Sequence, residues 1–224
     1  QLGQKIVRAT KWSTITQIAS KIIAPVTNMI LARILAPEAF GVIATVTMII
    51  SFTEMFTDSG FQKYLIQREF KNNKEKNESA NVAFWTNFVL AVFLWLIISI
   101  FNEQVAVLVG NPGLGIVIIV ACAQLPLTSF SSIQMALYRR EFDFKTLFVV
   151  RIIGVFIPIL ITIPLALLGF DYWSLIIGNI CMQLFNAIFL TIKSEWKPKF
   201  FYDFDLLREM LSFSIWTLIE SISI

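Results

Sequence analysis

Histidine is absent from the 224 residues, and cysteine occurs only twice. Without histidine, the chain lacks the commonest general base and the commonest metal ligand of proteins. Cys122 and Cys181 each lie inside an apolar segment, where a free thiol packs as a small hydrophobic side chain. The sequence also has no glycine-rich nucleotide loop and no evident nucleophile–base pair. We therefore expect no enzymatic activity, no metal site and no cofactor.

Charged residues are scarce as well. They make up 15% of the chain, against about 25% in an average soluble protein. Hydrophobic residues account for 57%, and the mean hydropathy is +0.74. This balance excludes an ordinary soluble domain and predicts an all-α, polytopic membrane protein.

Six apolar segments are each about 20 residues long, the length that an α-helix needs to cross a bilayer. A seventh begins near Leu206 and runs to the last residue. Because the sequence lacks an initiator methionine and ends within this run, we expect it to be a piece of a longer protein. Residues 1–192 would form a first transmembrane unit, and 193–224 a link and the start of the next. The predicted spans are 12–34, 41–65, 82–101, 114–137, 147–168 and 173–192.

Basic residues alternate between the links that join these spans. The N-terminal segment and the links after the second, fourth and sixth spans carry 13 Lys and Arg together. The other links carry only Arg33, at the edge of the first span. Since cytoplasmic links of membrane proteins are enriched in Lys and Arg, we expect the N-terminus to lie in the cytoplasm.

The second span contains two carboxylates. Thr47, Ser51, Glu54 and Asp58 recur at spacings of four, three and four, which places them on one face of a helix. A charge near the middle of a span costs about 2.5–3.5 kcal/mol on the insertion scale. The acidic face should therefore meet a counter-charge or a water-filled cavity, and not lipid.

Polar side chains recur at helical spacing in four other spans. Such residues often only hydrogen-bond a neighbouring helix, a contact worth about 0.6–2 kcal/mol. The number of these stripes, two of which hold ionised groups, favours a shared hydrated cavity. The cavity-lining residues that we predict are Gln17, Asn28, Gln124, Thr128, Asn179 and Gln183.

Lys21 and Arg151 are basic side chains that lie more than one helical turn inside their spans. Lys21 is about 15 Å from the predicted cytoplasmic end of its span, a depth similar to that of Glu54, so the two could pair. Such a pair would be either a fixed bond between helices or part of a substrate or ion route. Arg151 has no acidic residue within its own span. It would either reach back to the lipid headgroups or grip an anionic group such as phosphate.

Four segments resemble the N-terminal half of bacterial Wzx-type flippases, which export lipopolysaccharide and exopolysaccharide repeat units. This family belongs to the superfamily that also holds the lipid II flippase and the multidrug/toxin extruders. The segments are LARILAPEAFG (Leu31–Gly41), DSGFQKYLIQRE (Asp58–Glu69), ALYRREFDFKTL (Ala136–Leu147) and KPKFFYDFDLLREMLSFS (Lys197–Ser214).

The resemblance implies a MATE-like fold of two six-helix lobes around a central cavity, of which this chain would be the first lobe. It implies a place in the bacterial inner membrane and the transfer of undecaprenyl-diphosphate-linked oligosaccharides from the inner to the outer leaflet. Arg151, Lys21 and Arg33 would then bind the anionic diphosphate. Glu54 and Asp58 would bind a coupling H⁺ or Na⁺. The expected partners are this lipid-linked substrate, membrane lipids and the polysaccharide polymerase machinery, and not nucleic acid.

Two alternatives remain at this point. A drug or cation extruder of the same fold would need an acidic cavity, whereas these spans contain both acidic and basic residues. A membrane-embedded glycosyltransferase or ligase would want a large outer loop or clustered catalytic acids, and the sequence has neither.

Overall fold

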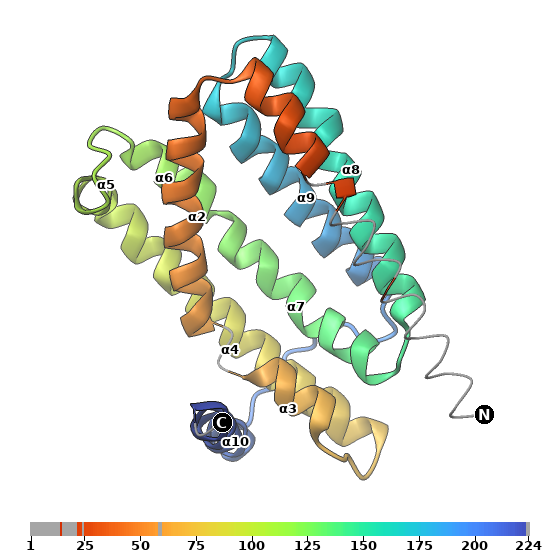
Figure 1. Ribbon diagram of the computed structural model, residues 1–224. Helices are drawn as coiled ribbons and strands as arrows, with labels where there is room; N and C mark the ends of the chain where they lie inside the picture. Colours follow the sequence, from red (N-terminus) through yellow and green to blue (C-terminus); the bar gives the residue numbers. More distant parts are fainter. Residues whose placement is uncertain (1–13, 15–21, 24, 58–59, 223–224) are drawn as a thin grey trace.

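The computed structural model describes residues 14, 22–23, 25–57 and 60–222, without the side chains of 217–222. All regular structure in these residues is α-helical (Figure 1). Residues 25–34 are helical and precede the labelled helices. Their bounds are α2 Pro37–Thr57, α3 Phe61–Gln67, α4 Asn73–Ile100, α5 Asn102–Leu108, α6 Gly115–Cys122, α7 Gln124–Arg140, α8 Phe144–Leu167, α9 Tyr172–Lys193 and α10 Phe204–Ile222.

Five helical segments of the described chain are long and apolar enough to cross a membrane. They are α2, α4, α6 together with α7, α8 and α9. This confirms an all-helical, multi-pass membrane protein. Of the 23 residues of the predicted span 12–34, ten lie outside the described residues, so the six-helix lobe stays a prediction.

The predicted span 41–65 is wrong as a single helix. α2 ends at Thr57, and α3 begins at Phe61 after Gly60, whose φ of +80° is left-handed. A side chain disfavours this backbone conformation, so glycine is the natural residue at the break. The fourth predicted span is confirmed as one apolar segment long enough to cross a membrane, Gly115–Arg140, although a turn at Ala123 separates α6 from α7.

Two other boundaries also differ from the prediction. α4 begins nine residues before the expected start of its span, because Asn72 caps it by accepting a hydrogen bond from the backbone N–H of Glu75 at 2.8 Å. Part of the expected outer link 102–112 is helical as α5.

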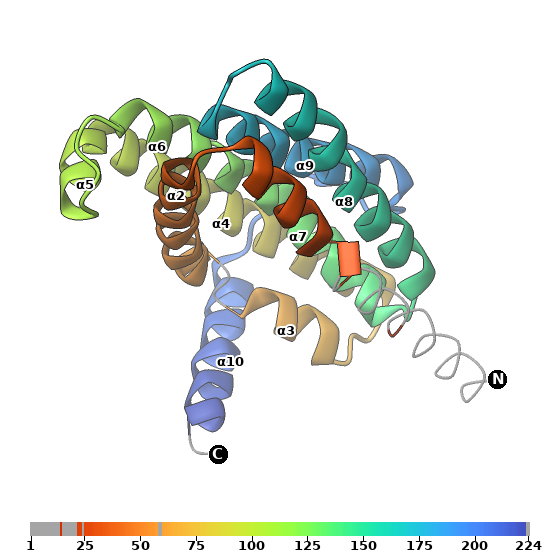
Figure 2. The same ribbon diagram turned by 45° about the horizontal axis from the view of Figure 1, so that its top comes forward.

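The long helices form a layer in which α7 packs on α4 and on α9, and α9 packs on α8 (Figures 1 and 2). The basic links between α3 and α4, between α7 and α8, and after α9 lie at one end of the layer. Lys76, in the first turn of α4, and Glu141, in the link between α7 and α8, form an ion pair at 2.9 Å. The links around α5 and between α8 and α9 lie at the other end (Figure 1). The chain therefore alternates between two ends, as the charge pattern predicts, and the assignment of the basic end to the cytoplasm remains a prediction.

One face of α4 is apolar and exposed. Val89, Phe93, Leu96 and Ile100 follow one another at spacings of four, three and four. An exposed apolar stripe of this kind on a membrane helix is suited to contact with acyl chains. The polar cavities described below involve other faces of the helices.

Close packing of α8 and α9 depends on Gly178. A Cβ atom built there would overlap the Thr162 hydroxyl and lie 3.6 Å from the Pro158 Cα atom. Thr162 is buried and β-branched, so its side chain has little freedom to move away. Small residues allow membrane helices to approach in this way.

We expect Gly178→Ala to lower the stability of the detergent-solubilised protein by about 1–3 kcal/mol, the usual effect of overpacking. A thermal melt would measure this change. Adding Thr162→Ala should recover most of the loss because it removes the atom that the new methyl group meets. Gly41→Ala is the matched control, since nothing lies within 4 Å of a Cβ there. An equal loss in both single variants would contradict this account of the α8–α9 contact.

Candidate functional site

A cavity of about 480 Å³ lies between the ends of α7, α8 and α9. Arg139 of α7 and Arg151 of α8, both exposed, line it together with Asn186 of α9. Apolar side chains from the three helices form most of the remaining wall. We call this space the arginine cavity.

Asn186 is the buried polar group of the arginine cavity. It is 9% exposed, and within the described chain its Oδ1 atom has no hydrogen-bond partner. Its Nδ2 atom donates to Gln183 Oε1 at 3.5 Å. Gly154 of α8 faces this amide, and a Cβ there would lie 3.4 Å from Asn186 Oδ1, an ordinary van der Waals contact. A buried polar atom without a partner is costly, which points to water or a ligand at this place.

A second cavity, of about 180 Å³, lies between α2, α3, α4 and α7. Since a liquid water occupies about 30 Å³, it has room for several waters. We call it the glutamate cavity, because Glu54 of α2 lines it. Its other polar lining residues are Thr57, Gln62, Asn87, Thr128, Ser129 and Ser132.

The hydroxyl groups of the glutamate cavity donate to carbonyls of their own helices. Thr128 Oγ1 donates to the Leu125 carbonyl at 2.8 Å, and Ser129 Oγ donates to the Pro126 carbonyl at 2.6 Å. Thr57 and Ser132 do the same with Glu54 and Ser129. With these hydrogens engaged, the hydroxyls offer the cavity oxygen lone pairs.

Asn87 adds an amide to the glutamate cavity. It is 3% exposed, and its Oδ1 atom has no hydrogen-bond partner among the described residues. The cavity thus combines a carboxylate, an amide and several hydroxyl oxygens between four helices. Oxygen-rich sites of this composition suit hard cations or protonatable carboxylates.

The predicted site residues divide into three groups. Arg151 lines the arginine cavity, and Glu54 and Thr128 line the glutamate cavity. Lys21, Gln17 and Asp58 lie outside the described residues, so neither the Lys21–Glu54 pair nor a role for Asp58 is tested. The residues that line neither of the two cavities are Arg33 and Asn28, which are exposed, and Gln124, Asn179 and Gln183, which are half-buried.

The structure places Glu54 and Arg151 in separate cavities, and no described residue lines both. The lining residues that were not among the predicted site residues include Arg139, which falls in a predicted link, and Asn87, near the start of the predicted span 82–101. The sequence could have indicated that Asn87 is a site residue, because the rest of its span after Asn87 has almost no polar side chains. Nothing in the sequence pointed to Arg139, because its place in the same cavity as Arg151 depends on how α7 and α8 pack.

The chain is similar to proteins of polysaccharide biosynthesis. A family model described as "Polysaccharide biosynthesis protein" matches residues 30–224. The succinoglycan biosynthesis transport protein ExoT of Rhizobium meliloti is 27% identical over 212 residues, which is 95% of this chain and 42% of that protein. The lipopolysaccharide biosynthesis protein WzxC of Escherichia coli is 21% identical over 227 residues, which is 99% of this chain and 44% of that protein.

A shorter similarity links the chain to an uncharacterized membrane protein in the cps region of Klebsiella pneumoniae. The two are 31% identical over 105 residues, which is 47% of this chain and 21% of that protein. The chain therefore spans less than half the length of these curated relatives. No solved structure matches it.

Proposed function

Because the chain belongs to the polysaccharide biosynthesis protein family, whose model matches residues 30–224, we propose that it takes part in moving polysaccharide precursors across the bacterial inner membrane. The substrate would be an oligosaccharide repeat unit linked to undecaprenyl diphosphate, carried from the inner to the outer leaflet. Relatives named for succinoglycan transport and lipopolysaccharide biosynthesis support this proposal. The protein acts here as a carrier and not as an enzyme.

The arginine cavity is the observation that carries the proposal. A diphosphate that joins a lipid to a sugar carries two negative charges, and guanidinium groups bind phosphate oxygens through paired, charge-assisted hydrogen bonds. Arg139 and Arg151 would supply this charge, and the apolar wall around them suits the lipid that bears the diphosphate. A basic cavity also argues against the alternative of a cation extruder, because it repels cationic substrates.

The glutamate cavity supports coupling to an ion gradient. Its oxygen atoms suit a monovalent cation, and its carboxylate can instead take up a proton. Either H⁺ or Na⁺ would serve an antiporter that uses no nucleotide. Glu54 is the residue that we propose for this role, and Asp58 remains a second candidate outside the described residues.

A gene deletion tests the proposed function directly. We expect the deletion strain to lose surface polysaccharide and to accumulate the lipid-linked repeat unit, because synthesis continues while transfer stops. Lipid extraction and mass spectrometry would measure the intermediate. Unchanged surface polysaccharide, with increased sensitivity to cationic drugs, would instead favour the extruder.

A further inference from the structure

α3 and α10 pack against each other through aromatic and apolar side chains. Phe61, Tyr64 and Leu65 of α3 are buried in one cluster with Met210 of α10. The Tyr64 and Phe213 rings meet edge to face, with centroids 5.4 Å apart. These two helices include parts of Asp58–Glu69 and Lys197–Ser214, two of the segments that resemble Wzx-type flippases. The proposed transport route assigns no role to either segment.

The backbone at the start of α3 also fits α10 closely. A Cβ at Gly60 would lie 2.7 Å from the Ser214 hydroxyl and 2.9 Å from its Cβ. Gly60 therefore serves two purposes, the left-handed turn after α2 and the close approach of α10.

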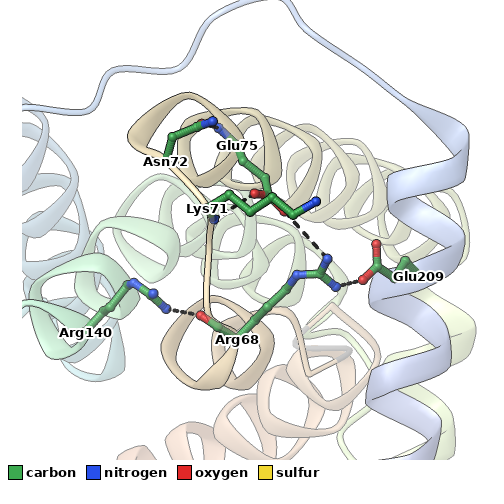
Figure 3. Close-up of polar contacts among 6 residues, drawn as sticks. All are labelled: Arg68, Lys71, Asn72, Glu75, Arg140 and Glu209. Carbon is green, nitrogen blue, oxygen red and sulfur yellow. Dashed lines mark hydrogen bonds and ion pairs between the residues drawn. The ribbon is translucent and has the colours of Figure 1, made fainter.

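Arg68 joins α3 to α10 by an ion pair. Its guanidinium group pairs with Glu209 of α10 and lies 3.6 Å from a Glu75 oxygen of α4 (Figure 3). It also lies over the Tyr64 ring, 5.2 Å from the centroid. Burial raises the pKa of the Tyr64 phenol, so the ring stays neutral and offers Arg68 its π face.

Arg140 holds the other side of α3. It donates to the backbone carbonyls of Leu65, Ile66 and Arg68, which would otherwise lack partners at the end of the helix. Its guanidinium group also lies 4.6 Å from the centroid of the Phe70 ring. α3 is thus fixed to α7 by several bonds to one half-buried cation, whereas the side chains of the Arg68–Glu209 pair are 32% and 44% exposed.

The segment that leads into α10 is fixed to α4. Trp85 Nε1 donates to the Lys199 carbonyl at 2.9 Å, and the Lys199 N–H donates to Asn81 Oδ1 at 3.0 Å. The Tyr202 and Thr86 hydroxyls share a hydrogen bond of 3.0 Å. The N-terminal end of α10 is therefore anchored, and the contacts of Glu209, Phe213 and Ser214 with α3 lie further along the helix.

We propose that the α3–α10 contact is a reversible latch, with Arg68 and Glu209 as its ion pair. The inference rests on the proposed transport function, because a carrier must separate and rejoin its helices at one membrane face in each cycle. Partly exposed ion pairs contribute only about 0–1 kcal/mol, so this pair can open and close repeatedly. α10 would pivot at its anchored start, while Arg140 keeps α3 in place on α7.

Cysteine cross-linking tests the latch. In a protein whose Cys122 and Cys181 are replaced by alanine, Arg68→Cys and Glu209→Cys would be combined and joined in membranes by a bifunctional methanethiosulfonate, whose length takes the place of the two long side chains. We expect the cross-link to reduce export at least tenfold and its reduction to restore export. Export at the full rate with the cross-link formed would overturn the latch while leaving the proposed function intact.

Charge exchange tests the ion pair itself. We expect Arg68→Glu or Glu209→Arg alone to reduce export severalfold, and the double variant to recover most of it despite the nearby Glu75. Lys74→Glu is the matched control, because Lys74 pairs with Glu78 within α4 and is largely exposed. A double variant no better than the single ones, at equal membrane abundance, would overturn the pair. If a charge-reversed variant does not accumulate in the membrane, the neutral variant Arg68→Gln is tested in its place.

Discussion

Replacing Arg151 by alanine is expected to abolish surface polysaccharide while leaving the protein in the membrane at its normal amount. Arg151 and Arg139 supply the positive charge of the arginine cavity. The Arg151→Ala variant would therefore offer an anionic diphosphate only half of that positive charge. Losing a charge-assisted hydrogen bond in a confined site costs about 1.5–3 kcal/mol, or roughly a tenfold to hundredfold loss of affinity. Quantification of polysaccharide on cells that carry the chromosomal variant would measure the effect.

Two comparison variants make this result specific. Lys145→Ala removes an exposed charge of the same helix outside the cavity, and we expect it to export normally. Arg151→Lys retains the positive charge but lacks the planar guanidinium group with its paired N–H donors, so we expect partial export. Normal polysaccharide in Arg151→Ala cells would remove Arg151 from the site.

Replacing Glu54 by glutamine is expected to uncouple export from the ion gradient. In wild-type vesicles, collapse of the proton and sodium gradients should slow export about tenfold, which corresponds to about 1.4 kcal/mol. The Glu54→Gln variant should export slowly with or without a gradient, because its neutral amide neither takes up a proton nor attracts a cation. Flux in inverted vesicles with and without ionophores would measure this dependence.

The control for Glu54 lies on the same helix. Glu38 is an exposed acid in the first turn of α2, and Glu38→Gln should keep the full gradient dependence. Separate collapse of the proton and the sodium gradient would also identify the coupling ion. If Glu54→Gln vesicles respond to the gradient as the wild type does, the coupling role of Glu54 is excluded.

Apolar length and charge placement predicted the membrane architecture well. α8 and α9 differ from the spans 147–168 and 173–192 by only a few residues at each end. Their apolar runs are bounded by turns at residues 141–143 and 169–171, so the sequence marks their ends. The resemblance to Wzx-type exporters is confirmed by the family match and the named relatives.

Hydropathy could not predict the break between α2 and α3. Phe61, Tyr64 and Leu65 continue the apolar run of α2, yet they are buried against α10 and not against lipid. A hydropathy window cannot distinguish these two environments, because both are apolar. Gly60 was the available signal, but a glycine within a membrane helix is common and does not by itself predict a turn.

The site was predicted only in part for a similar reason. Helical spacing places residues on a face of one helix and says nothing of the helix that this face meets. Glu54 and Thr128 therefore emerged from separate stripes and turned out to line one cavity. Arg151 emerged alone, and Arg139 joined it only through the packing of α7 on α8.

The central claim is that Arg151 lies in a water-filled cavity, and thiol accessibility tests it most directly. Arg151→Cys and Leu160→Cys would be made in a protein with Cys122 and Cys181 replaced by alanine. A thiol must ionise to react, so a membrane-impermeant maleimide labels it only where water reaches. Leu160 lies on the same helix, is 71% exposed and lies outside the cavity, so it serves as the lipid-facing control. We predict rapid labelling at position 151 and none at 160, whereas equally poor labelling at both would contradict the account.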